Sequence, residues 1–316
     1  MSLDLLNLPL EALINHFLNA NKRLFWLYLV SAAVIAFVIF IKQRNQGNFF
    51  CFIFDKSVWL HKSAKQDYII WLINIVIKLS VIIPLLFAAA PIAIFISQQL
   101  TALFGEQPPI SNSRSIVMFC FTLLVFLLDD FTRFYLHYLM HRVPWLWQLH
   151  KVHHSAEVLT PFTVYRIHPI ESALYAMRLV FVQGVAIGIG FYIFGHQLNI
   201  LEVLGANLIL FVFNIMGSNL RHSHIWFGWG NIIENWFISP AQHQIHHSIH
   251  QRHFDKNFGS VLAIWDRVFK TLLLSKETER PEGFGLSDCK NEGLLKMYFK
   301  PLIPFPRLLK SRLRRG

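Results

Sequence analysis

The chain has 316 residues, of which 54% are hydrophobic and 30 are Phe, with a mean hydropathy of +0.43 and a formal net charge of +11. A soluble domain of this size does not normally bury so much apolar surface, so the composition excludes an ordinary soluble protein and indicates an integral membrane protein. Three scattered cysteines, Cys51, Cys120 and Cys289, indicate neither a disulfide framework nor an iron–sulfur site.

The first predicted membrane helix covers residues 24–41. This run carries no charge and is flanked by Lys22 and Arg23 on one side and by Lys42 and Arg44 on the other. A signal peptide fits poorly, because the apolar run starts late and follows acidic residues rather than a basic segment.

Further apolar runs follow at residues 69–96, 115–128, 173–194 and 200–216. A lysine at the bilayer centre costs roughly 2.5–3.5 kcal/mol. Because the run 69–96 contains Lys78, we expect its crossing to begin at residue 79. Together with the first helix, these runs predict an all-α integral membrane protein with four to five transmembrane helices.

Basic residues near the spans predict the orientation. The loop of residues 42–67 carries five Lys or Arg, against two in the N-terminal segment, so this loop is expected in the cytoplasm. Counting crossings from there places residues 129–172 and all residues after 216 on the same cytoplasmic face.

Three regions are expected along the chain. Residues 1–66 form an N-terminal membrane anchor with a basic cytoplasmic loop, and residues 67–290 form the main membrane domain. Residues 291–316 form a basic amphipathic tail, which has seven Lys or Arg and no acid from residue 296 to residue 315. This tail suits anionic lipid headgroups, although a solvated basic tail explains the same composition.

Eight histidines occur in three clusters with helical spacing: His137 and His141; His150, His153 and His154; and His243, His246 and His247. Residues three and four apart share a helix face, so each cluster directs several imidazoles toward one point. A structural zinc ion is satisfied by four ligands, so eight imidazoles predict two metal ions. All three clusters lie in segments assigned to the cytoplasmic face.

Further residues are candidates for the same site. His222 and His224 follow the last apolar run, and their spacing of two directs them apart on a helix, so we favour His222 as a ligand over His224. Asp130, His168 and Glu171 are expected to hold or orient the ligand imidazoles rather than to bind metal.

The ligand type limits the identity of the metal. Imidazole suits zinc, copper, iron and nickel. Two ions with open positions beside a hydrocarbon phase make most sense for oxygen chemistry on an unactivated C–H bond, which zinc cannot perform because it does not change oxidation state. Zinc can nevertheless load the same imidazoles in the isolated protein.

The order of the three clusters, with the segments around them, resembles the fatty acid hydroxylase and sterol desaturase superfamily of membrane di-iron enzymes, in particular its bacterial members. The supporting segments are residues 145–147 (Trp-Leu-Trp), 239–242 (Ser-Pro-Ala-Gln), 255–259 (Asp-Lys-Asn-Phe-Gly) and 264–267 (Ile-Trp-Asp-Arg). The resemblance covers residues 127–269, close to half of the chain.

The resemblance implies a cytosolic helical cap that holds two irons between the eight clustered histidines, which are also the catalytic centre, with His222 as an intermediate ligand and a bacterial inner membrane as the location. It implies reductive activation of dioxygen at a diferrous centre, giving an oxidant that removes hydrogen from an alkyl carbon. Hydroxylation of a fatty acyl, sterol or related lipid is the favoured outcome, and desaturation at the same site is the alternative.

The electrons must come from another protein. The chain has no flavin, nicotinamide, haem or iron–sulfur motif, so a reductase, ferredoxin or cytochrome is expected as a partner. A hypothesis from another class is a membrane metal carrier, but transporters place ionisable residues inside their spans, whereas these histidines gather at the ends. A structural zinc protein would leave many imidazoles unused.

Overall fold

The computed structural model describes residues 2–44, 47–85, 89–195, 208–289 and 292–303. Within these residues the regular structure is helical, apart from two isolated bridges that pair Phe237 with Leu262 and Ser248 with Phe284. The predicted all-α class is therefore confirmed for the described part of the chain.

The α-helices are α1 (Ser2–Leu18), α2 (Trp26–Lys42), α3 (Phe49–Ile53), α4 (Lys56–Trp59), α5 (Lys62–Leu85), α6 (Ala89–Phe104), α7 (Arg114–Arg142), α8 (Pro144–His154), α9 (Pro169–Phe194), α10 (Leu208–Ile215), α11 (Asn231–Glu234), α12 (Pro240–His246), α13 (Ile264–Val268) and α14 (Leu294–Phe299). Short 3₁₀ helices connect them: η2 (Pro161–Tyr165), η5 (Ser218–His222), η6 (Gln251–His253), η7 (Ser287–Cys289) and η8 (Lys300–Leu302).

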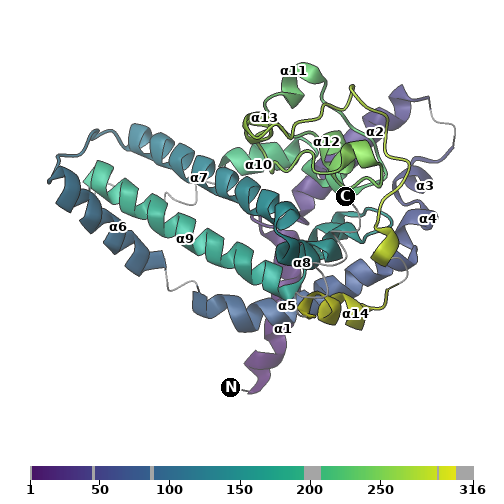
Figure 1. The fold of residues 1–316 in the computed structure, drawn as a ribbon, viewed down its shortest axis with the longest axis horizontal. Helices are drawn as coiled ribbons and strands as arrows, with labels where there is room; N and C mark the ends of the chain where they lie inside the picture. The colour runs from purple at the N-terminus through teal and green to yellow at the C-terminus, as the bar shows by residue number, and fades with distance from the viewer. Residues whose placement is uncertain (1, 45–46, 86–88, 196–207, 290–291, 304–316) are drawn as a thin grey trace.

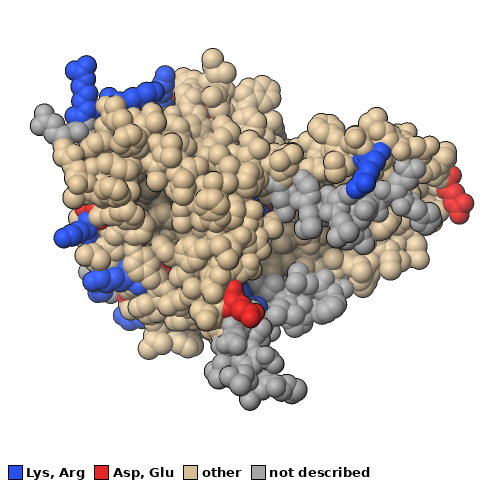
Figure 2. Space-filling view, turned by 180° about the vertical axis from the view of Figure 1, so that it is seen from behind, with Lys and Arg blue, Asp and Glu red and all other residues tan. Residues whose placement is uncertain are grey.

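Helices α6, α7 and α9 lie side by side as an arm, and the other elements gather at its end into a body (Figure 1). In the view from behind (Figure 2), the described residues of the arm show very few charged side chains, whereas several Lys and Arg lie on the surface of the body. This division of charge fits an arm in the membrane and a body at its edge.

Two helices of the described residues, α7 and α9, are long and apolar enough to cross a membrane. Helices α2 and α6 are apolar but shorter, with 17 and 16 residues. Helix α2 packs on η5, α10 and α3 in the body. The apolar run 69–96 is divided between α5 and α6, and residues 200–207 of the last predicted crossing lie outside the described residues.

Two glycines let α6 and α9 approach closely. A Cβ atom on Gly184 would lie 2.6 Å from the Cβ of Ile92, and one on Gly188 would lie 2.6 Å from the carbonyl oxygen of Ala93. Small residues four apart are a common means of bringing membrane helices into contact. The Gly184–Gly188 pair therefore explains why α6 packs on this face of α9.

A polar network joins α7 to α9 where the apolar stretch of α7 ends. The Asp129 carboxylate accepts hydrogen bonds from Arg178 at 2.7 Å and from Arg133 at 3.0 Å, and Arg178 also donates to Thr132 at 2.7 Å. A helix of 29 residues is about 43 Å long, more than the roughly 30 Å hydrocarbon core. The last turns of α7, with His137 and His141, therefore extend past the apolar region.

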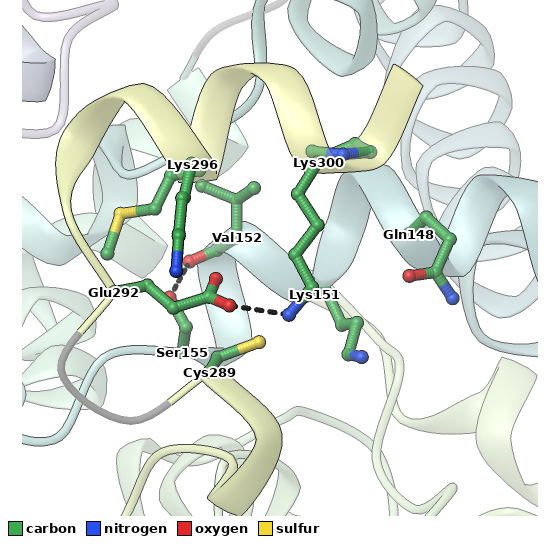
Figure 3. Close-up of a pocket in the computed structure, with 10 residues that line it drawn as sticks. Gln148, Lys151, Val152, Ser155, Cys289, Glu292, Lys296 and Lys300 are labelled. Atoms are coloured by element: carbon green, nitrogen blue, oxygen red, sulfur yellow. Dashed lines mark hydrogen bonds and ion pairs between the residues drawn. The ribbon is translucent and has the colours of Figure 1, made fainter. Parts of the chain in front are cut away.

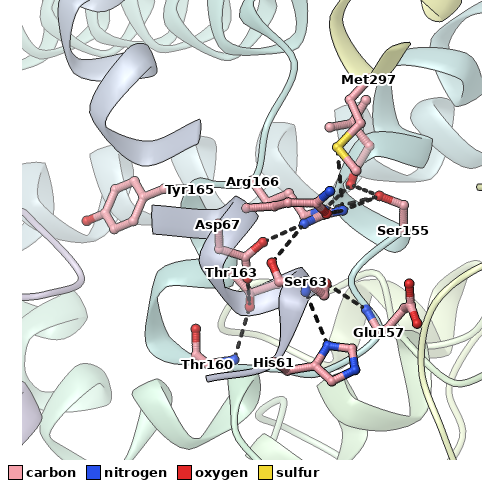
Figure 4. A network of polar contacts seen from close by, with 12 residues as sticks. His61, Ser63, Asp67, Ser155, Glu157, Thr160, Thr163, Tyr165, Arg166 and Met297 are labelled. Atoms are coloured by element: carbon pink, nitrogen blue, oxygen red, sulfur yellow. Dashed lines mark hydrogen bonds and ion pairs between the residues drawn. The ribbon is translucent and has the colours of Figure 1, made fainter. Parts of the chain in front are cut away.

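A fully buried arginine ties α5 to α8 (Figure 4). Arg166 forms an ion pair with Asp67 at 2.7 Å and donates to the carbonyl oxygen of Val152 and the hydroxyl of Ser155, both at 2.9 Å. Asp67 also accepts a 2.6 Å hydrogen bond from Thr163 of η2. These contacts fix the C-terminal half of α8, which carries three of the clustered histidines.

Part of the predicted tail belongs to the body. Helix α14 packs on α8 with Met297 buried beside Val152, and Figure 3 shows Lys300 paired with Glu292 at this contact. Lys151 of α8 also pairs with Asp288. Residues 304–316, which hold most of the basic side chains expected in the tail, lie outside the described residues.

Candidate metal centre

Nine histidines come together in two neighbouring groups. Site A contains His137, His141, His150, His154 and His246, and site B contains His153, His222, His243 and His247; within each group one ligand atom per residue lies within 4.8 Å of the others. The rings of His154 and His247 stack at 4.6 Å, so the two sites adjoin. The arrangement provides two places for metal ions.

Two of the three clusters contain three histidines each, and each of these triplets contributes to both sites. His150 and His154 of α8 belong to site A, whereas His153 between them belongs to site B. In the second triplet, His246 belongs to site A, and His243 and His247 belong to site B. Residues four apart share a face and the residue next to one of them points elsewhere, so the repeated spacing places each triplet between two ions.

The distances between ring nitrogens in site B fit a shared cation. The Nε2 atoms of His222, His243 and His247 form a triangle with sides of 3.1, 3.2 and 3.3 Å. A neutral imidazole nitrogen either carries a proton or accepts one, so three such atoms cannot satisfy all three contacts by hydrogen bonds. Nitrogens bound to one ion at about 2.1 Å lie about 3.0–3.4 Å apart, which matches the triangle.

Site A has unpartnered nitrogens that face one another. The Nε2 atoms of His141, His154 and His246 are buried without a hydrogen-bond partner, and those of His137 and His150 are 3.1 Å apart. An unpaired buried polar atom costs about 1–3 kcal/mol, so five converging imidazoles without a shared ion would be unfavourable. Both donor sets consist of imidazole, which suits iron as well as zinc, copper and nickel.

The outer ring nitrogens of two site A histidines are held by backbone acceptors. Nδ1 of His137 donates to the carbonyl oxygen of Phe258, and Nδ1 of His246 donates to that of Lys256, both at 2.8 Å. A carbonyl oxygen can only accept, so each of these rings carries its proton on Nδ1 and directs a lone pair on Nε2 into site A.

The loop that supplies these carbonyl groups has an unusual backbone. Asp255 and Asn257 both have φ of +58°, a region that non-glycine residues rarely adopt but that Asn and Asp tolerate best. The Asn257 side chain stabilises the loop, because it donates to the carbonyl oxygen of Leu273 at 2.9 Å and accepts from its amide nitrogen at 2.8 Å. The left-handed residues turn the carbonyl groups of Lys256 and Phe258 toward the histidines.

Glu171 lies where a residue that orients a ligand is expected. Its Oε1 accepts a 2.8 Å hydrogen bond from Nδ1 of His150, and both side chains are buried. Glu171 stands in the first turn of α9, which begins with His168 as N-cap and Pro169. A carboxylate on the outer nitrogen fixes the ring and raises its basicity as a ligand.

Local sequence explains the position of the second triplet. Helix α12 starts with a capping box, in which the Ser239 hydroxyl accepts from the Gln242 amide and the Gln242 side chain accepts from the Ser239 amide. The Gln244 side chain then donates to the carbonyl oxygens of Leu220, Ser223 and Ile225. These bonds fix η5 to α12 and bring His222 to His243 and His247.

Burial keeps these imidazoles neutral. It lowers the pKa of His153 to about 3, and burial followed by nearby imidazoles holds the pKa of His154 and His247 well below its ordinary value. The same holds for His150 and His243. Neutral rings keep their lone pairs at neutral pH, which metal binding requires.

His224, the less favoured of the two candidate ligands, belongs to neither site in the structure. Its Nε2 donates to the carbonyl oxygen of Phe52 at 2.7 Å, and the ring lies against Phe52 at 5.9 Å, outside both sites. His222 ends η5, whereas Ser223 has an extended backbone, and this change of direction separates the two rings. The favoured member of the pair, His222, is the one that reaches site B.

Two of the three expected supporting residues act elsewhere. Asp130 accepts from the amides of Val261 at 3.0 Å and Leu262 at 3.1 Å and from Nε1 of Trp265 at 2.9 Å, so it holds a loop and not an imidazole. His168 accepts from the amide of Ile170 and donates to the carbonyl oxygen of Tyr298. No sequence pattern indicates these partners, because all but Ile170 are far from Asp130 and His168 in the chain.

Comparison with known proteins identifies relatives for the central part of the chain. Residues 122–271 match the family model described as fatty acid hydroxylase, a range slightly longer than the expected 127–269. Cholesterol 25-hydroxylase of Rattus norvegicus is 30% identical over 179 residues, which cover 55% of this chain and 52% of that protein. Alkylglycerol monooxygenase of Homo sapiens is 26% identical over 152 residues, which cover 48% of this chain and 30% of that protein.

The aligned segments cover only part of this chain and only part of each relative. The chain spans about half of the cholesterol 25-hydroxylases and less than a third of the human alkylglycerol monooxygenase. Helices α1 to α6 precede the residues matched by the family model, and no solved structure matches the chain. All nine histidines of sites A and B lie within the matched residues.

Proposed function

We propose that the chain, whose residues 122–271 match the fatty acid hydroxylase family, is a metal-dependent membrane oxygenase that hydroxylates an alkyl carbon of a lipid. Its relatives include a cholesterol hydroxylase and an alkylglycerol monooxygenase, both of which oxidise lipids by name. The observation that carries the proposal is the pair of adjoining imidazole sites at the end of the apolar arm.

The residues of sites A and B would hold two iron ions. When bound, these ions would supply reductive activation of dioxygen, chemistry that the protein's own side chains lack. The chain's contribution is to hold the imidazoles with their lone pairs inward, through Glu171 and the carbonyl groups of Lys256 and Phe258. Burial of the histidines, eight of which are 3–8% exposed, excludes bulk water from the reacting carbon.

The location follows from the ends of α7 and α9. His137 and His141 lie in the last two turns of α7 and Glu171 lies in the first turn of α9, so all three sit at the same end of the arm. Loop charges favour the cytoplasm for this end, and four to five crossings remain the expected topology. Electrons are then delivered from the cytoplasm by a separate reductase, ferredoxin or cytochrome.

Desaturation is the second candidate reaction, since it needs the same ions and differs in how the substrate carbon is held. The rat and human relatives are named as a hydroxylase and a monooxygenase, which favours hydroxylation. Metal transport is disfavoured, because the histidines form two closed clusters at one end of the arm rather than a path along it.

The test is to express the chain with a reductase system, purify it, and measure both bound metal and cellular lipids. We expect about two irons per chain and a lipid that has gained one oxygen atom. His154→Ala and His247→Ala should abolish this product, whereas His250→Ala, which changes an exposed histidine outside both sites, should not. A lipid that loses two hydrogens instead would favour the desaturase, and unchanged lipids with two irons bound would contradict both reactions.

A further inference from the structure

An apolar cavity of about 180 Å³ lies between α2 and η5. Its walls come from α2, from the segment with α3 and α4, from residues 159–161 and from residues 219–225. Most lining side chains are hydrocarbon, among them Leu29, Ala33, Ile53, Leu159, Leu220 and Ile225. A cavity of this lining binds apolar groups in preference to water.

Polar side chains at the cavity bind the backbone around it. Asn219 donates to the carbonyl oxygen of Arg23 at 2.9 Å, Ser223 to that of Leu220 at 2.8 Å, and His224 to that of Phe52 at 2.7 Å. Two other polar atoms of the lining, Oγ1 of Thr160 and Nδ1 of His224, are buried without a hydrogen-bond partner. Because the rest of the lining is largely apolar, a polar ligand would replace few of its hydrogen bonds to water, whereas a hydrocarbon ligand would lose none.

The cavity shares a wall with site B. Leu220 and Ser223 line the cavity on either side of His222, whose ring lies in site B. On the same side, residues 159–161 lead into η2, which packs on η5. A chain held in the cavity would therefore lie next to the proposed metal centre.

Helix α2 separates the cavity from the outer surface of the molecule. Ala32, Ala33 and Ala36 face the cavity, and their small side chains leave its space open. The opposite side exposes large apolar residues, with Val30 49% and Val34 58% exposed. An outer face of this kind suits lipid, so the cavity has hydrocarbon surroundings on the far side of one helix.

We propose that this cavity binds the alkyl chain of the lipid substrate, and that α2, which lies outside the family-matched residues, determines which chains fit. The proposal rests on the proposed oxygenase function for the identity of the ligand as substrate. It names a flexible alkyl or acyl chain as the recognised part, with the polar headgroup outside the cavity.

The test is photo-crosslinking in lipid nanodiscs, with a long-chain fatty acid that carries a diazirine near its methyl end. Adducts mapped by mass spectrometry are expected on the cavity residues Ala33, Ile53 and Leu220. Ala33→Leu and Ala33→Phe should reduce these adducts stepwise, to less than about a fifth for Phe, because the added side chains fill the cavity. The matched control is Val34→Phe, which adds the same ring on the exposed side of α2 and should leave the adducts unchanged.

Two further readouts separate the possible failures. Bound metal and melting temperature show whether Ala33→Phe has folded. If it has not folded, the smaller Ala33→Leu is used in its place to test whether filling the cavity reduces the adducts. Unchanged cavity adducts in both Ala33 variants, or adducts confined to Val30 and Val34, would overturn the proposal. Crosslinking needs no turnover. If the fatty acid labels the cavity but the protein oxidises no lipid, the proposed function would be contradicted and the cavity would still be a lipid-binding site.

Discussion

At the scale of single residues, we expect the carboxylate of Glu171 to strengthen metal binding by His150. Glu171→Gln keeps an oxygen acceptor for Nδ1 of His150 but removes the charge, and Glu171→Ala removes both. Loss of such an outer partner typically costs 10–100-fold in metal affinity, so we expect about 10-fold for Gln and about 100-fold for Ala. Competition with a chelator measures the affinity, and the exposed Glu279→Gln is the control. Equal affinities in all four proteins would contradict this role.

A second residue-scale prediction concerns Asp130, which accepts three hydrogen bonds that hold residues 261–265. Asp130→Asn turns an amide NH₂ toward one of these donors, so we expect a loss of about 1–3 kcal/mol of stability, read as a lower melting temperature. Asp55→Asn is the control, because Asn caps α4 as well as Asp does. A melting temperature equal to that of Asp55→Asn would show that the loop does not depend on the carboxylate.

How far single residues can be predicted from sequence depends on whether their role is local. The eight clustered histidines are recognisable because spacings of three and four carry their own geometric meaning. The split of each triplet between two sites cannot be recognised from the sequence, because it depends on how α8 and α12 face each other. The carbonyl groups of Lys256 and Phe258 also carry no side-chain signal, although residues 255–259 belong to the segments that resemble the family.

At the scale of elements, the close contact between α6 and α9 depends on the absence of a side chain at Gly188. Gly188→Leu would place atoms where the Ala93 carbonyl now lies, and overpacking of this kind costs about 1–3 kcal/mol. We expect a lower melting temperature and less folded protein, but unchanged metal per folded chain, because the histidines lie at the other end of the arm. Phe181→Leu, on an exposed position of the same helix, is the control. An unchanged melting temperature would show that the helices can separate freely.

Apolar runs identify helices better than they identify crossings. The runs at 115–128 and 173–194 lie within α7 and α9, yet α7 extends to Arg142 because a polar network continues the helix beyond its apolar part. The run at 24–41 corresponds to α2, whose partners are η5 and α10 in the body. Hydropathy measures composition, whereas the choice of neighbours depends on shapes such as the alanine face of α2.

At the scale of the whole molecule, the neutral imidazoles that α8 and α12 bury together make the metal-free protein sensitive to acid. In the unfolded chain these histidines take up protons near pH 6.5, whereas in the folded protein burial lowers the pKa, to about 3 for His153. The unfolded state therefore binds more protons below pH 6.5, and stability falls as the pH falls, by up to about 1.4 kcal/mol per pH unit for each histidine. We expect the melting temperature of chelator-treated protein to drop steadily between pH 7 and pH 5. His154→Phe, which removes one such group, should flatten this slope, whereas His250→Phe at an exposed position should not. Equal slopes in the wild type and His154→Phe would show that the clustered histidines are already protonated in the folded protein and that neutral ligand rings do not describe the metal-free state.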